Sequence, residues 1–283
     1  MIDCSISIVN YNTRDLALAC IASVIRHTQN VSYELILIDN ASADGSVESV
    51  REKFPQVQII ANPENLHFTK ASNQGMRASK GRYLFTMNPD SYIQEDIFGP
   101  MVRYMDENPK VGAAGPTYLN PDGTIQALGH RFPGILYALF ELLLINAVFP
   151  RNPVKLARVY TENKLMEIDA MGGGGIMVRR EVIDRVGILD EGFLGYFEDT
   201  DWCKRIRGAG WPIMHLPDVN MYHIGGVSTV KVNREMFERM QFNSMQYYYG
   251  KYYGRLAAIP IRILRFGFHD PALKAVRFLK KAF

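Results

Sequence analysis

The sequence is poor in cysteine, and this excludes several classes of protein. Its 283 residues contain three cysteines, Cys4, Cys20 and Cys203, which are scattered and form no C-x-x-C pair. A disulfide-stabilised secreted scaffold and a cysteine-based zinc site both need more cysteines at closer spacing. We therefore predict a reduced, intracellular setting in which the three thiols are buried.

Long hydrophobic runs are also absent. The most apolar stretch, residues 134–150, is shorter than the roughly 20 residues that a membrane-spanning helix needs, and it contains Glu141 and Asn146. The first residues, MIDCSISIVNYN, lack the basic start and apolar centre of a secretion signal and are typical of a β-strand. We expect neither export nor a transmembrane helix.

Glycine-rich phosphate-binding loops are missing as well. No G-x-G-x-x-G follows the first predicted strand, and the glycines at 172–175 lack the G-x-x-x-x-G-K-[ST] pattern. A nucleotidyltransferase on a similar sheet would need a glycine-rich loop after its first strand, where this chain has VNYNTRDLA. This counts against that class of enzyme.

Charge is small in sum but unevenly distributed. The formal net charge is +3, yet residues 251–283 contain eight lysines and arginines and a single acidic residue, Asp270. In this tail, basic residues alternate with apolar ones, a pattern that favours an anionic membrane interface over nucleic acid as the partner. The alternative is a helix docked on the protein's own body. The apolar positions are Ile261, Leu264, Phe268, Leu273, Val276, Phe278 and Leu279.

Strand and helix patterns alternate through residues 5–90. Apolar strand-like runs separated by amphipathic helices indicate an α/β protein with a mostly parallel, Rossmann-like sheet covered on both faces. After residue 115 the pattern predicts a hairpin over 115–132, with NPDG as its turn, and then a loop, a strand and a helix over 167–187. The strands are expected over 5–12, 33–40, 56–63 and 81–90, and the helices over 15–28, 44–54 and 68–80.

Polar residues follow each of the first four strands. They are Asn10–Thr13, Asp39–Ser42, Asn62–Phe68 and Asn88–Ser91. A single polar strand end is an ordinary turn, since Asn and Asp favour turns. Four of them meeting at one edge of a parallel sheet indicate a ligand pocket, because ligands bind beyond the carboxyl ends of the strands.

Several of these residues have two readings. Asp39 is either an acceptor for a ligand N–H or a turn residue that caps the next helix. Asp90 either closes an Asn-Pro-Asp turn or holds Mg²⁺ or Mn²⁺, which prefer oxygen ligands. His223 is either a partly buried histidine bonded to the protein or part of the ligand site.

Three acidic residues, Glu198, Asp199 and Asp201, lie within four positions in FLGYFEDTDWCKRIRGAGW, residues 193–211. One or two acids are enough to complement the start of a helix, so a third needs solvent or a function. A carboxylate of raised proton affinity suits general-base catalysis. We expect Glu198 and Asp201 to raise the proton affinity of Asp199 by like-charge repulsion, while the helix N-terminus lowers it.

The motifs together resemble glycosyltransferase family 2, a family of inverting enzymes with the GT-A fold. They occur in the family's order and cover roughly residues 5–230. Within the family, the chain is most similar to bacterial rhamnosyltransferases that build O-antigen and related cell-surface polysaccharides. The motifs are SIVNYNT, LILIDNASADGS, NPENLHFTKASNQGM, YLFTMNPDS, the segment from GGGGIMVRR to RGAGW, and MYHIGGVS.

This resemblance implies a nucleotide-sugar site and a divalent cation, Mg²⁺ or Mn²⁺. NPDS looks like this chain's form of the Asp-x-Asp metal motif, with Asn88 in place of the first aspartate, so the metal is expected on Asp90 and His223 with help from the diphosphate. The family usually has glycine where this chain has His67. In the family, the residue that matches Asp39 recognises the pyrimidine of the nucleotide. The residues implied to bind the nucleotide-sugar are Asn10, Asn12, Asp39, Asn65, Asn73, Asn88 and Asp90.

The resemblance also implies the catalytic roles. Asp199 matches the family's base, Glu198 is expected to position the acceptor, and Asp201 with Trp202 is expected to support the structure. The glycines at 172–175 are expected to let the backbone approach closely beneath the acceptor.

From these observations we expect an inverting transferase that moves a sugar, L-rhamnose from dTDP-rhamnose, to a lipid-linked glycan on the cytoplasmic face of the cell membrane. The alternatives are a family-2 transferase with a UDP-hexose donor and an inactive protein that binds a nucleotide-sugar. We divide the chain into a GT-A domain, residues 1–230, and a basic helical region, residues 231–283. Residues 134–150 are a candidate second membrane contact.

Overall fold

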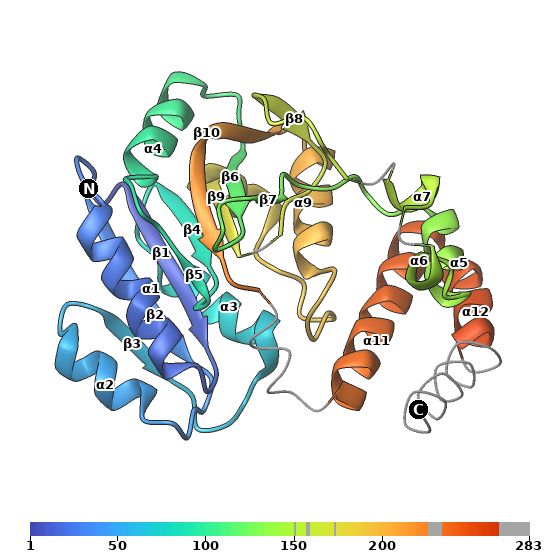
Figure 1. The fold of residues 1–283 in the computed structure, drawn as a ribbon, viewed down its shortest axis with the longest axis horizontal. Helices are drawn as coiled ribbons and strands as arrows, with labels where there is room; N and C mark the ends of the chain where they lie inside the picture. The colour runs from blue at the N-terminus through green and yellow to red at the C-terminus, as the bar shows by residue number, and fades with distance from the viewer. Residues whose placement is uncertain (150, 157–158, 173, 226–233, 266–283) are drawn as a thin grey trace.

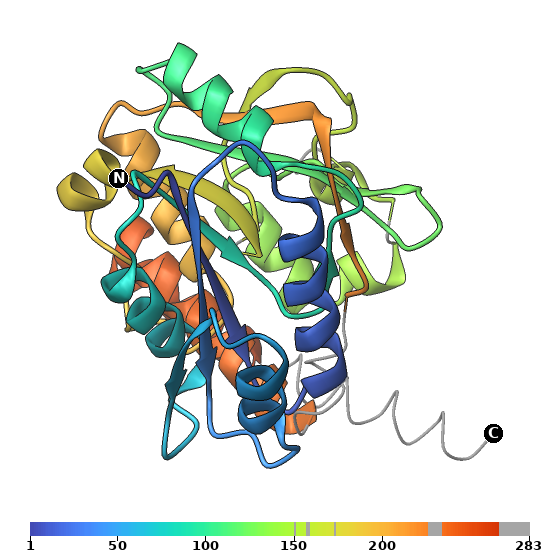
Figure 2. The ribbon, with the colours of Figure 1, turned by 90° about the vertical axis from the view of Figure 1, so that its left-hand side faces the viewer.

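The computed structural model describes residues 1–149, 151–156, 159–172, 174–225 and 234–265. Its centre is a 10-stranded sheet: eight strands follow the order β3-β2-β1-β4-β9-β6-β10-β5, and the other two are β7, which pairs with β6, and β8, which pairs with β10 (Figure 1). Helices pack on both faces of this sheet, as the second view shows (Figure 2). The architecture is a mixed α/β fold.

The first half of the chain folds as its periodicity predicts. Strands and helices alternate, and β1 pairs in parallel with both β2 and β4, while β2 pairs in parallel with β3. The elements are β1 (Cys4–Asn10), α1 (Arg14–His27), β2 (Tyr33–Asp39), α2 (Ser46–Lys53), β3 (Gln58–Ala61), α3 (His67–Ala78) and β4 (Tyr83–Met87).

Strand β2 shows why these runs are almost wholly apolar. Leu35 and Leu37 point into the main core, and Ile36 and Ile38 point to the opposite face, where they pack near Ala71 of α3. A strand buried on both faces cannot show the alternation of a half-exposed strand.

The second half departs from the expectation of a mostly parallel sheet. Strand β9 runs antiparallel to β4 and β6, and β10 is parallel to β6 but antiparallel to β5 and β8. Periodicity shows which residues are buried and carries no information on strand direction. The elements are β5 (Ser91–Tyr92), α4 (Phe98–Glu107), β6 (Ala113–Leu119), β7 (Ile125–Ala127), β8 (Met166–Ile168), β9 (Gly175–Arg179), α8 (Arg180–Val186), α9 (Glu198–Gly208) and β10 (Ile213–His223).

A second, smaller core lies beside the sheet, where segments far apart in sequence meet (Figure 1). Ala138 and Leu142 from α5 and Phe193 from the loop before α9 pack with Tyr248 and Ile261 from the C-terminal helices. The predicted division near residue 230 falls outside the described residues. The elements around this core are α5 (Ile135–Leu142), α6 (Ile145–Val148), α7 (Pro153–Leu156), α11 (Arg234–Tyr253) and α12 (Arg255–Leu264).

The structure of helix α12 shows that part of the membrane prediction for the basic tail is wrong. Ile261 is buried in the second core and Leu264 packs against it, so these two residues face the protein and not a membrane. The exposed apolar residues of this helix are Leu256, Ile259 and Ile263. The predicted membrane-facing residues Phe268, Leu273, Val276, Phe278 and Leu279 lie outside the described part of the chain.

Two further expectations concern the thiols and the membrane. Cys4, Cys20 and Cys203 are all buried free thiols, as predicted. Among the described helices, none combines the length and the apolar character that crossing a membrane requires.

Candidate functional site

The ends of β1 and β2 form one side of the site. Asn10 lies opposite Asp39 in the register of the two strands, and both side chains are buried. The Asn10 amide donates to Oγ of Ser42 (3.1 Å), which also accepts from the backbone N–H of Asn12 (2.8 Å). The Asn12 side chain in turn accepts from the backbone N–H of Ala43 (2.8 Å). Asn10 and Asn12 therefore join the two strand-end loops to each other.

Asp39 carries a clear sign of a ligand. Its Oδ2 accepts from the backbone N–H of Ser42 (3.1 Å), whereas its Oδ1 is buried and has no hydrogen-bond partner among the described residues. A buried carboxylate oxygen without a partner costs about 1–3 kcal/mol and calls for an explanation. A donor from a bound molecule would satisfy this oxygen.

A network of side-chain amides shapes the next loop. Asn40 donates to Asn65 (2.8 Å) and accepts from Asn62 (3.2 Å), and Asn62 exchanges two bonds with Gln74 of α3 (2.8 and 2.9 Å). Asn65 also accepts from the backbone N–H of His67 (2.9 Å). Asn65 thus lies at the edge of the sheet with the other strand ends. Sequence reasoning did not name Asn40, Asn62 or Gln74 as site residues, although Asn40 and Asn62 lie in the polar strand ends described above.

His67 begins α3 with φ of +63°. This left-handed conformation is unfavourable for a residue with a Cβ and costs nothing extra for glycine. The backbone conformation explains why a family with this loop would favour glycine here.

Asn73 lies elsewhere in the structure. It is fully buried in α3, its amide donates to the backbone carbonyl of Leu189 and to the carboxylate of Glu191 (both 2.9 Å), and its oxygen accepts from the Leu189 N–H (3.0 Å). Both amide hydrogens are used within the protein. In this structure Asn73 fastens α3 to the loop after α8.

Asp90 and His223 come together although they are far apart in sequence. Strands β5 and β10 pair so that Ser91 lies opposite His223. This pairing leaves Nε2 of His223 3.3 Å from Oδ1 of Asp90, and the two side chains are 22% and 5% exposed. A buried carboxylate beside an imidazole nitrogen is a donor set that fits a divalent cation.

Asp90 and His223 alone do not complete the coordination of a metal ion. Among the described residues no group of three or more His, Cys, Asp or Glu side chains is arranged to hold a metal ion. A cation at Asp90 and His223 would take its other ligands from water and from the phosphate oxygens of a bound nucleotide, as Mg²⁺ commonly does.

The glycine segment links the metal side of the site to the acidic cluster. A Cβ on Gly174 would lie 2.4 Å from Nδ2 of Asn88, and one on Gly172 would lie 3.9 Å from Oδ2 of Asp199. The Gly172 carbonyl accepts from the hydroxyl of Tyr118 (3.0 Å). The backbone therefore approaches Asn88 closely at Gly174, and Asp199 lies near Gly172 at the other end of this short segment. The expected place of these glycines beneath the acceptor stays a prediction.

Helix α9 begins at the acidic cluster and gives its three carboxylates different surroundings. Asp199 accepts from the backbone N–H of Thr200 (2.6 Å) and its Oδ2 faces Gly172. Glu198 is buried, and its Oε2 has no hydrogen-bond partner among the described residues. Burial, and then the negative charge of Asp199, raise the pKa of Glu198 well above its ordinary value. The sequence predicts the raised proton affinity at Asp199; in the structure, the raised pKa belongs to Glu198.

Asp201 points away from this pair. It is fully buried and is bonded to Arg205 (2.8 Å), Lys251 (2.7 Å) and Tyr252 (2.7 Å). Its neighbour Trp202 donates to the Gly187 carbonyl (2.9 Å) from the main core. Both residues thus have the contacts of supporting structure.

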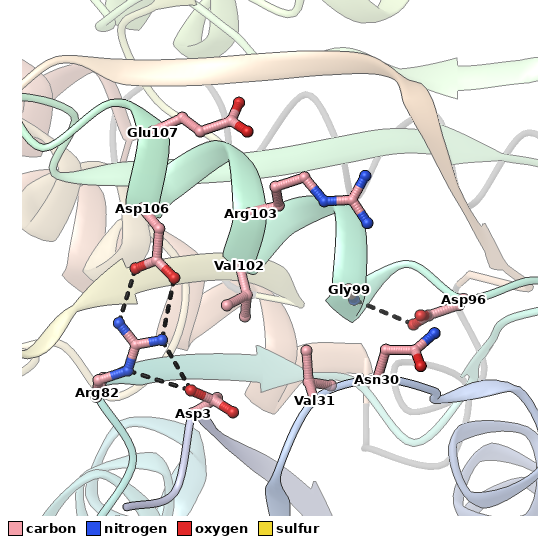
Figure 3. A pocket seen from close by; sticks show the side chains of 10 residues that line it. All are labelled: Asp3, Asn30, Val31, Arg82, Asp96, Gly99, Val102, Arg103, Asp106 and Glu107. Carbon is pink, nitrogen blue, oxygen red and sulfur yellow. Dashed lines mark hydrogen bonds and ion pairs between the residues drawn. The ribbon is translucent and has the colours of Figure 1, made fainter.

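A surface depression of about 520 Å³ lies at the opposite end of the sheet (Figure 3). It is lined by residues that precede β1, β2 and β4 and by residues of α4, and in it Arg82 bridges Asp3 and Asp106 (both 2.7 Å). Ligands of such sheets bind at the carboxyl ends of the strands. Since this arginine is held by two carboxylates, we assign the depression to structure.

Fold and site together define a class of protein. The sequence model described as Glycosyl transferase family 2 matches residues 5–187. That is well over half of the chain, and the chain therefore belongs to glycosyltransferase family 2.

Its relatives narrow this class. The chain is 26% identical over 210 residues to the N-acetylglucosaminyl-diphospho-decaprenol L-rhamnosyltransferase of Mycobacterium tuberculosis, covering 69% of this chain and 67% of that one. It is 26% identical over 230 residues to the dTDP-rhamnosyl transferase RfbF of Shigella flexneri, covering 80% and 70%.

A solved structure shares the fold. The crystal structure of GalNAc-T7 with UDP, GalNAc and Mn²⁺ matches with a TM-score of 0.59 at 17% identity, covering 79% of this chain and 44% of that one. This similarity confirms a GT-A-like arrangement of a central sheet flanked by helices.

Proposed function

We propose that the chain is an inverting glycosyltransferase that moves L-rhamnose from dTDP-rhamnose to a lipid-linked glycan during synthesis of a cell-surface polysaccharide. The observation that carries this proposal is the shared strand edge: the unpartnered oxygen of Asp39 lies there with the Asp90–His223 pair and, across Gly172–Gly174, with Asp199. The names of the two similar rhamnosyltransferases support the choice of sugar.

In this proposal Asp39 selects the base of the donor. Its buried Oδ1 accepts the N–H of a pyrimidine ring, which supplies the missing hydrogen bond. Asn10, Asn12 and Asn65 hold the strand-end loops in the shape that receives the nucleotide.

The diphosphate lies on the side of Asp90 and His223, with Asn88 beside it. These residues would hold Mg²⁺ or Mn²⁺; the similar GalNAc-T7 structure contains Mn²⁺. When bound, the cation supplies positive charge to the leaving diphosphate. Asp90→Asn is expected to abolish divalent-dependent transfer, and an unchanged rate with a chelator present would contradict the metal assignment.

Asp199 takes the proton of the acceptor hydroxyl. The oxygen of that hydroxyl attacks the anomeric carbon of the donor sugar, and the bond from this carbon to the diphosphate breaks on the opposite side. Burial and the charge of Asp199 raise the pKa of Glu198, so its surroundings differ from those of Asp199, which takes the role of base. The buried Glu198 positions the acceptor.

The catalytic test compares two variants that keep the side-chain shape. Asp199→Asn removes the base, so we expect transfer to fall at least about a hundredfold with little change in donor affinity. Glu198→Gln keeps the size of a side chain that only positions the acceptor and leaves the base in place, so its loss of transfer should be smaller. If Asp199→Asn turns over normally, or loses donor binding instead, Asp199 is not the base.

The donor is identified by thermal shifts with dTDP-rhamnose and UDP-hexoses in the presence of Mn²⁺. A ligand at 100 times its Kd stabilises the folded state by about 2.7 kcal/mol. We expect the larger shift from dTDP-rhamnose and its loss in Asp39→Ala. A larger shift from a UDP-hexose would replace the rhamnose assignment, and binding without any transfer would indicate an inactive nucleotide-sugar-binding protein.

We further propose that the protein binds the cytoplasmic face of the membrane through the apolar surface of α5, α6 and α12. On α12, Leu256 and Ile263 are 80% and 64% exposed, and Phe149, directly after α6, is 63% exposed; the sequence from residue 251 onward is rich in lysine and arginine. Apolar area together with basic residues favours an anionic interface.

The membrane test must spare the second core. Deleting residues 255–283 would remove Ile261 from that core and so risk unfolding. Replacing Leu256, Ile259 and Ile263 with serine changes only exposed side chains. We expect this variant to stop sedimenting with anionic liposomes, whereas Ile125→Ser on the distant hairpin should sediment like wild type. Equal sedimentation of both variants would contradict this surface.

A further inference from the structure

We propose that Gln126, which neither sequence reasoning nor the family resemblance singled out, is a positioning residue that fixes the tautomer of His223. In this role it directs the lone pair of Nε2 at the space shared with Asp90, where a divalent cation binds; this inference rests on the metal site proposed above.

The hydrogen bonds of Gln126 determine the orientation of its amide. Nε2 of Gln126 lies 3.0 Å from the backbone carbonyl oxygen of His223 and 3.0 Å from Oδ1 of Asn120. A backbone carbonyl can only accept a hydrogen bond, so the amide NH₂ must face it. Oε1 of Gln126 then faces Nδ1 of His223 at 2.7 Å.

This orientation determines the protonation of the imidazole. Oε1 of Gln126 can only accept, so Nδ1 of His223 must carry the hydrogen. In the neutral ring, Nε2 is then a pure acceptor. It lies 3.3 Å from Oδ1 of Asp90, which also accepts. Two acceptors at this distance repel unless a positive charge lies between them.

The spacing fits a metal ion. Two ligands at right angles on an octahedral cation, each at about 2.1 Å, stand about 3 Å apart. The observed separation of 3.3 Å is close to this value. Metal-bound histidines usually donate their other ring N–H to a carbonyl or carboxylate, which sets the tautomer and the ring orientation, and Gln126 occupies this place.

The backbone explains how Gln126 reaches the histidine. In the β6–β7 hairpin Leu119 pairs with Ile125, but Tyr118 pairs with Ala127, so Gln126 is an extra residue on its strand. A bulge of this kind turns a side chain out of the regular alternation, and bulges are frequent beside active sites. The hairpin thus serves to present Gln126 to the metal site.

The first test reads the tautomer directly. In metal-free protein at a pH where His223 is neutral, ¹⁵N NMR of the imidazole distinguishes Nδ1–H from Nε2–H. We expect the Nδ1–H form in the wild type and a shift toward Nε2–H in Gln126→Leu. A wild-type Nε2–H form would overturn the proposal, whether or not the protein binds metal.

The second test measures the affinity for Mn²⁺ by electron paramagnetic resonance of the free ion. Gln126→Leu should weaken binding by about tenfold or more, the range seen when a partner of a metal-bound histidine is lost. Gln126→Glu keeps an acceptor opposite Nδ1 and should restore binding. Asn120→Ala is the matched control. It removes the hydrogen bond from Nε2 of Gln126 to Oδ1 of Asn120 and should bind Mn²⁺ like wild type.

Two ligand variants separate this inference from the metal site itself. If Asp90→Asn and His223→Ala weaken Mn²⁺ binding but Gln126→Leu does not, the role of Gln126 is wrong and the metal site stands. If neither ligand variant weakens binding, the metal site is wrong and the inference falls with it. Equal weakening by Gln126→Glu and Gln126→Leu would also contradict a role as acceptor.

Discussion

The substitution Asp201→Asn tests how the C-terminal helices are held to the transferase fold. Asp201 on α9 is 0% exposed, and its two oxygens accept from Arg205 of the same helix and from Lys251 and Tyr252 of α11. Burial lowers the pKa of Lys251, but its bonds to Asp190 and Asp201 outweigh this and raise the pKa above its ordinary value. The carboxylate is therefore the charge that joins the two helices.

The structure sets the size of the effect. Removing one partner of a buried ion pair typically costs about 3–5 kcal/mol. Here Lys251 keeps Asp190 (2.6 Å), and Arg205 keeps the carbonyls of Val186 (2.6 Å) and Ile188 (2.8 Å), so neither cation loses all its partners. We expect the lower end, about 3 kcal/mol, which lowers the Tm by about 6 °C for a protein of this size.

Urea unfolding followed by circular dichroism measures this loss. Asp15→Asn is the control, because Asp15 is 83% exposed in its pair with Arg14 and should cost less than about 0.5 kcal/mol. Combining Asp201→Asn with Lys251→Met tests the pair itself, since contacting residues should give a non-additive result. A loss below about 0.5 kcal/mol for Asp201→Asn, or full additivity with Lys251→Met, would refute the reasoning.

Three further predictions concern the site. His67→Gly should raise stability by about 0.5–1 kcal/mol in urea unfolding, because it removes the cost of a left-handed φ; a loss would show that the side chain makes a compensating contact. Glu198→Gln should gain stability over wild type as pH rises above 4.5: the folded wild type holds its proton more tightly than the unfolded chain, so its stability falls through the window between the two pKa values. Equal stability of the two proteins at pH 4 and pH 7 would contradict this. Gly174→Ala should weaken donor binding, because its Cβ would lie 2.4 Å from Asn88, and unchanged affinity would separate Asn88 from the donor site.

The local elements of the first half could be predicted from sequence because each one repeats a simple pattern. The strand expected over 33–40 begins where β2 begins, at Tyr33, and ends one residue beyond it, since β2 ends at Asp39. The polar strand ends also meet as expected, since parallel pairing brings Asn10 opposite Asp39. Periodicity and strand order were sufficient for this part of the site.

The contacts between distant segments could not be predicted in the same way. The antiparallel direction of β9 follows from its pairing with β4 and β6, which leaves no mark on its own residues. NPDG predicts the turn of the hairpin correctly, but the one-residue bulge that points Gln126 at His223 is a property of the register. Asn73 has the residue type of a ligand, and only its burial against Leu189 shows where its bonds go.

The acidic cluster shows how helix geometry assigns different roles to neighbouring residues. Successive residues of an α-helix are rotated by about 100°, so Glu198, Asp199 and Asp201 face three directions from one helix start. Asp199 faces Gly172, Glu198 is buried with one oxygen that has no hydrogen-bond partner among the described residues, and Asp201 faces Lys251 of α11. The third acid therefore needs neither solvent nor a part in the chemistry, because the C-terminal helices supply its counter-charge. Without Lys251 opposite Asp201, this buried carboxylate would lose one of the two described cations that bond to it directly, so α11 stabilises the segment that presents the base.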